Sequence, residues 1–83
     1  MNEVHMSMQE HKLRVLTVLS DNLKEAEPQL VTSETIAGRL NMKMPELRQV
    51  LKSMEGLGII ETDPDLQYNL ITRKGLLWLQ HQN

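Results

Sequence analysis

The chain contains no cysteine and no phenylalanine, and Tyr68 and Trp78 are its only aromatic residues. The lack of cysteine excludes disulfides, thiolate metal sites and thiol nucleophiles, and a reducing cytoplasmic location is therefore expected. No apolar run is long enough to span a bilayer, and residues 1–10 lack the basic start and apolar core of a secretory signal. We expect neither export nor membrane insertion.

Signatures of catalysis and of metal binding are missing as well. His5, His11 and His81 are scattered, with no cysteine or carboxylate cluster nearby. Asp63 and Asp65 flank a proline and fall short of the roughly six to eight oxygen ligands of a calcium site. No glycine-rich phosphate loop is present, and no nucleophile, base and orienting acid can be assembled. The sequence predicts no metal, no cofactor and no enzyme activity.

What the chain does contain is the composition of one ordinary folded domain. Of its 83 residues, 40% are hydrophobic and 24% charged, which suits a single modest core. The net charge of −2 is unusual for a DNA-binding domain, because Lys and Arg contacts to phosphate supply most non-specific affinity. A role with DNA therefore depends on how the charges are distributed.

Apolar residues at three- and four-residue steps predict a first helix over residues 9–27. The stripe consists of Leu13, Val15, Leu16, Val18, Leu19 and Leu23. Pro28 sets its end, because proline disfavours the helical conformation in the residue before it. Residues 1–8 are left unassigned: a flexible segment, a strand and an extension of this helix all fit their sequence.

A short extended piece over residues 29–32 leads into a helix-turn-helix pattern over residues 33–58. Thr32 or Ser33 is expected to cap the second helix. Its apolar residues are Ile36, Ala37 and Leu40. After a tight connection the third helix runs from Pro45 to about Leu57. Gly58 is then suited to the left-handed conformation that closes a helix.

Two β-compatible runs, 59–62 and 67–71, are separated by Asp63-Pro64-Asp65-Leu66. A proline flanked by aspartates favours a turn, so residues 59–71 are predicted to form a hairpin. Thr72 can cap a last helix within residues 72–82.

This order of elements, with the residues of 35–42 and 47–60, resembles winged helix-turn-helix domains. The second segment is similar to the recognition helix and wing entry of bacterial repressors of the antibiotic-resistance and phenolic-acid types, and residues 68–75 are similar to their return strand. The resemblance covers about residues 10–80. It implies an α+β fold, with a three-helix core, a hairpin wing and a C-terminal helix in one domain over residues 1–83. It also implies sequence-specific binding of double-stranded DNA by a small transcriptional regulator.

In such domains the third helix enters the major groove. Here Arg48 can offer its guanidinium to guanine and Gln49 can pair with adenine, whereas Lys43 and Lys52 suit phosphate. The stretch from Arg39 to Lys52 has four basic residues and one acidic residue, a local charge of +3. The expected DNA-binding residues are Arg39, Lys43, Glu46, Arg48, Gln49, Lys52, Arg73 and Lys74.

Two alternatives to this interpretation stay open. Long basic side chains on the outer side of a helix often serve only solubility. Glu61, Asp63 and Asp65 place negative charge on the wing, which would repel phosphate, so the wing is not expected to hold DNA. The competing function is therefore a protein-interaction module, an adaptor without DNA binding, since fold alone does not fix function.

We expect a homodimer, because one recognition helix reads few base pairs. Apolar residues 76–79 point around most of the last helix, more than one monomer's core easily covers. This predicts a dimer interface at Leu76, Leu77 and Trp78. In the alternative, Leu76 and Leu79 enter the core and Trp78 lies flat on the surface.

Overall fold

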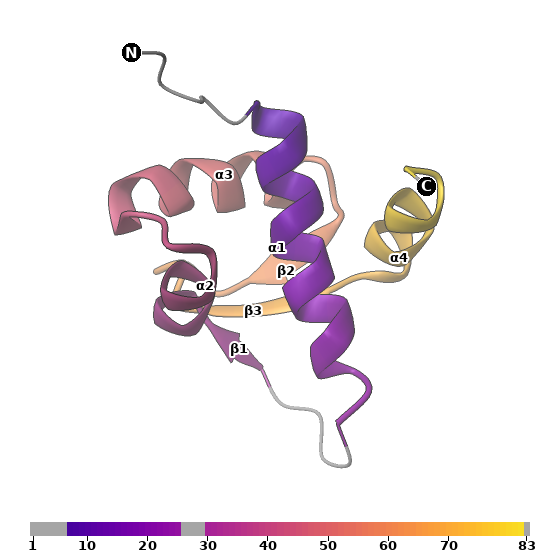
Figure 1. Cartoon of the computed structure of the whole chain (residues 1–83), viewed down its shortest axis with the longest axis horizontal. Coiled ribbons are helices and arrows are strands. Elements are labelled where there is room, and N and C mark those ends of the chain that lie inside the picture. The colour runs from indigo at the N-terminus through magenta and orange to yellow at the C-terminus, as the bar shows by residue number, and fades with distance from the viewer. Residues whose placement is uncertain (1–6, 26–29, 83) are drawn as a thin grey trace.

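The computed structural model describes residues 7–25 and 30–82. These residues form four helices and three strands, shown in Figure 1. In chain order they are α1 (Met8–Asn22), β1 (Val31–Thr32), α2 (Ser33–Leu40), α3 (Met44–Gly56), β2 (Ile60–Thr62), β3 (Tyr68–Ile71) and α4 (Arg73–Gln80). The fold class is α+β, as the sequence predicts. None of the helices in these two stretches is long and apolar enough to cross a membrane.

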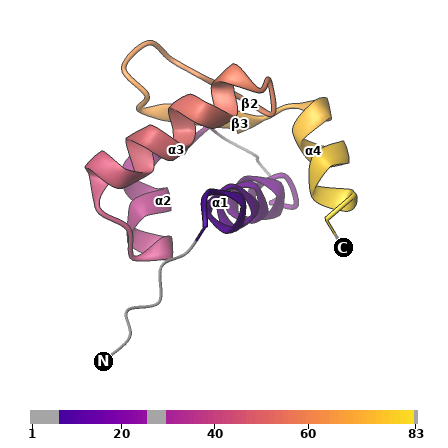
Figure 2. The same cartoon turned by 90° about the horizontal axis from the view of Figure 1, so that it is seen from above.

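Helix α1 lies at the centre of the molecule and contacts α2, α3, α4 and β3. Seen from above, α2 and α4 stand on opposite sides of α1, and α3 lies over the sheet (Figure 2). The α1 side chains in the core are Val15, Leu16, Val18 and Leu19. Burying one such side chain contributes about 1.5–3 kcal/mol, so the packing of α1 is a large source of stability.

Helix α1 ends at Asn22, before the predicted end near Glu27, which lies outside the described residues with Pro28. The backbone tightens at this point, since the amides of Leu23 and Lys24 donate to carbonyls three residues back, at 3.1 Å each. Leu23 is 41% exposed and thus does not continue the apolar stripe as predicted. Because Leu23 is not buried, it does not hold a further helical turn against the core. The predictions for residues 1–6 also lie outside the described part.

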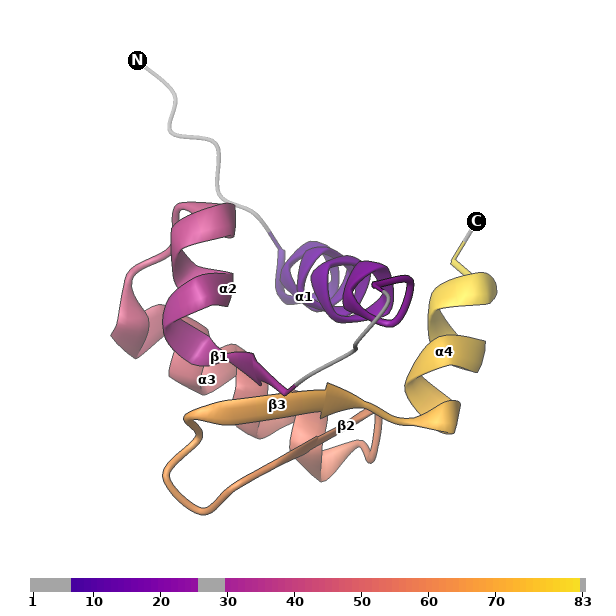
Figure 3. The same ribbon diagram turned by 90° about the horizontal axis from the view of Figure 1, so that it is seen from below.

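The three strands form an antiparallel sheet in the order β1-β3-β2, which Figure 3 shows from below. Val31 pairs with Asn69 and Glu61 pairs with Leu70. Alternation along the strands buries Val31, Ile60 and Asn69 against the helices and turns Glu61, Tyr68 and Leu70 outward.

Two predicted N-caps are confirmed by their hydrogen bonds. The Thr32 Oγ1 accepts from the amide of Thr35, and the Thr72 Oγ1 accepts from the amide of Gly75. Gly58 has φ of +75°, as expected after α3. Helix α3 begins with Met44 and Pro45, and Lys43 at its N-cap makes no side-chain capping bond.

Helix α4 packs beside α1 with only part of its apolar surface. Trp78 and Leu79 are half-buried against the core, Leu76 is also half-buried, and Leu77 is 48% exposed. The core of the same chain thus covers part of Trp78, and the predicted dimer interface at Leu76, Leu77 and Trp78 stays a prediction.

Candidate nucleic-acid interface

Helix α3 has one core face and one solvent face. Leu47, Val50, Leu51 and Met54 are buried. Arg48 and Lys52, four residues apart, lie together on the opposite side, and Gln49 lies next to them; all three are exposed. The thirteen residues of α3 give it a length of about 20 Å, enough to run along the major groove, which is about 12 Å wide.

The outward side chains of α3 are not engaged elsewhere in the described part of the chain. No hydrogen bond or ion pair within residues 7–25 and 30–82 ties the side chains of Lys43, Arg48, Gln49 or Lys52. An external anion can therefore reach these groups without first breaking an internal contact.

A groove of about 340 Å³ adjoins α3 on the side of the hairpin. Its lining residues are Thr32, Ser33, Glu34, Met44, Arg48, Gln67 and Tyr68. The guanidinium of Arg48 thus belongs to a concave surface that α3 shares with the start of α2 and with β3. Sequence reasoning missed Gln67 and Tyr68 as members of this surface, because the pairing of Thr32 with Tyr68 across β1 and β3 brings them there.

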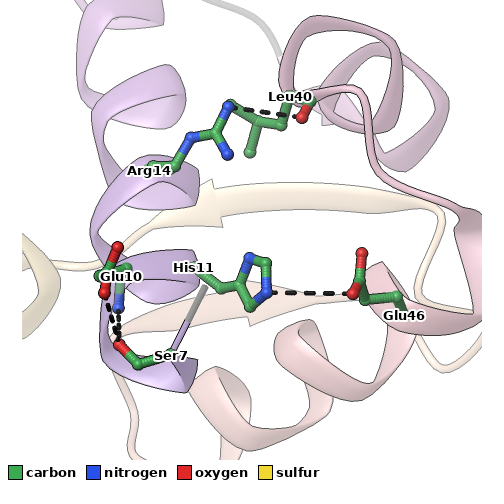
Figure 4. Close-up of polar contacts among 6 residues, drawn as sticks. All are labelled: Ser7, Glu10, His11, Arg14, Leu40 and Glu46. Carbon is green, nitrogen blue, oxygen red and sulfur yellow. Dashed lines mark hydrogen bonds and ion pairs between the residues drawn. The ribbon is translucent and has the colours of Figure 1, made fainter. Parts of the chain in front are cut away.

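Glu46 lies on a different side of α3 from Arg48. Its Oε2 is 4.0 Å from Nε2 of His11 on α1, as Figure 4 shows. His11 is mostly buried, and its Nδ1 has no hydrogen-bond partner among the described residues. Nearby on α1, the Arg14 guanidinium donates to the Leu40 carbonyl at 3.4 Å. The structure therefore places Glu46 at the contact between α1 and α3 and not beside Arg48.

The remaining predicted DNA-binding residues are dispersed around this centre. Arg39 is exposed on α2 but lines a second groove with Leu30 and Asn22, apart from Arg48. Arg73 and Lys74 are exposed at the start of α4. The Lys74 side chain passes beside Gly58, with its Nζ 3.9 Å from where a Cβ of that glycine would stand, so its charge lies near the C-terminal end of α3.

Two hydrogen bonds within the hairpin close its loop. The amides of Gln67 and Tyr68 both donate to Oδ1 of Asp63 at 2.7 Å. The Tyr68 bond is the main reason that the pKa of Asp63 lies below its ordinary value of 3.8, and the Gln67 bond adds to it. Asp63 is therefore charged at neutral pH, and Glu61 and Asp65 are exposed beside it.

A buried polar network ties the same loop to α2. The Ser33 amide donates to the Gln67 carbonyl at 2.9 Å, and the Ser33 hydroxyl donates to the Leu66 carbonyl. The Asn69 Nδ2 donates to Oγ of Ser33 at 3.0 Å and to the Val31 carbonyl at 3.1 Å. Leu66 is buried although its φ is +57°. The loop is thus fixed at the edge of the groove that Arg48 lines.

Across the described parts of the chain, His, Asp and Glu side chains nowhere gather in groups of three or more that could hold a metal ion. The features that stand out are a cationic helix face and the groove beside it.

Comparison with known proteins gives a likeness in structure but none in sequence. No model of a known protein family and no curated protein matches the chain. A solved structure from Ralstonia eutropha JMP134, described as a "putative DNA-binding protein", superposes with a TM-score of 0.71 and 23% identity. The match covers 87% of this chain and 93% of the other. The fold is that of a winged helix-turn-helix.

Proposed function

We propose that this chain binds double-stranded DNA by placing α3 in the major groove, and that it acts as a small sequence-specific transcriptional regulator, not as an enzyme. The observation that carries the proposal is the outward face of α3, where Arg48, Gln49 and Lys52 are exposed together and unpaired within the described residues. A guanidinium and an amide on such a face can read guanine and adenine, and a lysine can hold phosphate.

Three further observations support this proposal. The groove beside Arg48 gives a sugar-phosphate strand a place to lie next to the helix. Lys43 at one end of α3 and Lys74 near the other extend the positive surface along the helix. The protein that shares the fold is itself described as DNA-binding, though of unstated type. A repressor of the antibiotic-resistance or phenolic-acid type is the finer assignment that we propose.

The test is the binding of labelled random-sequence duplex DNA at low and moderate salt. Wild type is compared with the double variant Arg48→Ala, Lys52→Ala, and with Lys12→Ala, Lys24→Ala, which removes the same charge from the α1 region. We expect the α3 variant to bind at least roughly tenfold more weakly, because each lost base or phosphate contact costs about 1 kcal/mol or more. The slope of log affinity against log salt should also fall by about 1, because Lys52 is assigned to phosphate and Arg48 to a base.

The control variant should keep most of the affinity and the slope. Equal losses in both variants would mean that only net charge matters, and binding that ignores the α3 substitutions would overturn the assignment to α3. Selection of bound sequences from the random pool then shows whether recognition is sequence-specific.

A second candidate function is a protein-interaction module without DNA binding. The observation that favours it is the acidic loop, where Glu61, Asp63 and Asp65 stand on the hairpin that winged domains often bring to DNA. Absence of any duplex binding at low salt would favour this candidate over the first.

We further propose that the regulator is a homodimer joined through α4. The support is the exposed Leu77 together with the need for two recognition helices to read a long site. Because Trp78 is packed against its own core, the contact is expected to centre on Leu77.

A further inference from the structure

The outer face of the sheet carries an apolar patch that shares only Tyr68 with the groove of the proposed DNA contact, among the described residues. Leu30, Tyr68 and Leu70 are 52%, 47% and 37% exposed. Single exposed apolar residues are common, but three that lie together on one face form a patch of the kind that marks interaction sites. The pairing of Glu61 with Leu70 places a carboxylate at the border of this patch.

The patch contains a groove of about 190 Å³ lined by Leu30, Glu61, Thr62, Asp63, Tyr68 and Leu70. The described residues of its lining combine apolar side chains with two carboxylates and include no cation. The charge of Asp63 is fixed in place, because two backbone amides hold its carboxylate at 2.7 Å. Apolar side chains and negative charge therefore line the same groove.

Tyr68 separates this groove from the one that Arg48 lines. Among the described residues it is the only one that lines both grooves. The first groove is lined by one cation, Arg48, and one carboxylate, Glu34, whereas the charged residues lining the second are Glu61 and Asp63. The second groove therefore repels phosphate more than the first.

We propose that the outer sheet face is a docking surface for a protein segment in which arginine or lysine alternates with apolar residues. A cationic head group would lie beside Glu61 and Asp63, its aliphatic stem against Leu70, and its charge within reach of the ring of Tyr68. An apolar residue of the segment would cover Leu30.

The negative charge of Glu61 and Asp63 favours a basic segment over an acidic segment or a second copy of this chain. An acidic segment would be repelled by the carboxylates of Glu61 and Asp63. A second copy that used the same face would bring Glu61 and Asp63 of both copies into one contact, which like-charge repulsion disfavours. The proposal does not depend on DNA binding, and it leaves α3 free to bind DNA while the partner is docked.

The test follows backbone amide shifts of the labelled full chain during titration with a blocked Leu-Arg-Leu-Arg-Leu peptide. We expect shifts at residues 30, 61–63, 68 and 70, and much weaker ones with the matched Leu-Glu-Leu-Glu-Leu peptide. Glu61→Lys should weaken binding by roughly fivefold or more, since it replaces an attraction by a repulsion at an exposed site. Leu70→Thr should weaken it while keeping a β-compatible side chain.

Glu10→Gln is the control, because it removes an exposed carboxylate in the first turn of α1, 20 residues before Leu30, and should leave affinity unchanged. Equal response to both peptides, shifts centred on α3, or indifference to Glu61→Lys would overturn the proposal. Shifts of the same amides with protein concentration alone would also overturn it, since a second copy would then be the occupant.

Discussion

Two helical glycines of this chain have opposite surroundings. A Cβ on Gly38, within α2, would meet no atom within 4 Å. A Cβ on Gly75, in the first turn of α4, would stand 2.1 Å from the Ile59 carbonyl oxygen and 2.9 Å from Cγ1 of Ile71. Glycine is thus required at position 75, where the first turn of α4 lies against Ile59, the residue before β2.

The same substitution at these two sites is expected to change stability in opposite directions. Gly38→Ala should raise the free energy of unfolding by roughly 0.5–1 kcal/mol, because alanine loses less conformational freedom in a helix. Gly75→Ala should lower it by about 3 kcal/mol or more, because backbone must move to relieve the overlap. Urea unfolding followed by circular dichroism measures both, and a neutral Gly75→Ala would show that α4 does not sit against Ile59.

At the scale of elements, the hairpin loop depends on the charge of Asp63. Because backbone bonds lower the pKa of this carboxyl in the folded state, its stabilising effect is present above the ordinary value of 3.8. The effect is lost as the pH falls through the lower folded-state pKa.

Asp63→Asn is therefore expected to lower the urea midpoint at neutral pH, with a difference from wild type that shrinks in acid. Asp65→Asn serves as the control, because it removes the same charge from the same loop but leaves the two backbone bonds to Asp63 in place. A difference between wild type and Asp63→Asn that is the same at neutral and acid pH would contradict the role of the carboxylate.

Local rules in the sequence predicted most of the element termini. The caps at Thr32 and Thr72 and the turn at Gly58 follow from chemistry within a few residues, and the structure has all three. The exposure of Leu23 and the burial of Leu66 were not predicted, because each depends on which distant element packs against it.

In the candidate site too, some features follow from local sequence rules and others from the packing of distant elements. The shared face of Arg48 and Lys52 follows from the helical period alone. The contact of Glu46 with His11 does not, because it requires the packing of α3 on α1. The place of Arg39 in a separate groove depends likewise on the position of β1.

At the scale of the whole molecule, we predict that the chain is a dimer in solution and that Leu77→Glu makes it monomeric. Leu77 is 48% exposed, so the substitution should leave monomer stability within about 0.5 kcal/mol of wild type while placing a charge in the contact. Sedimentation velocity over a range of concentrations measures this. Leu57→Glu, at a site 44% exposed elsewhere, is the control. A wild-type chain that stays monomeric throughout would contradict the proposed α4 contact.

The anchoring of the hairpin loop limits how this protein can change over evolution. The loop is bonded to α2 through Ser33, and Leu66 fills a place in the interior. Inserting or deleting a residue would shift Leu66 out of its site and break the network around Asn69, at the cost of leaving buried polar groups without partners. Surface loops usually accept such length changes easily. Here the length of the loop is fixed. Under the proposed function, new DNA sequence preferences would therefore arise by exchanging side chains on α3 and not by lengthening the wing.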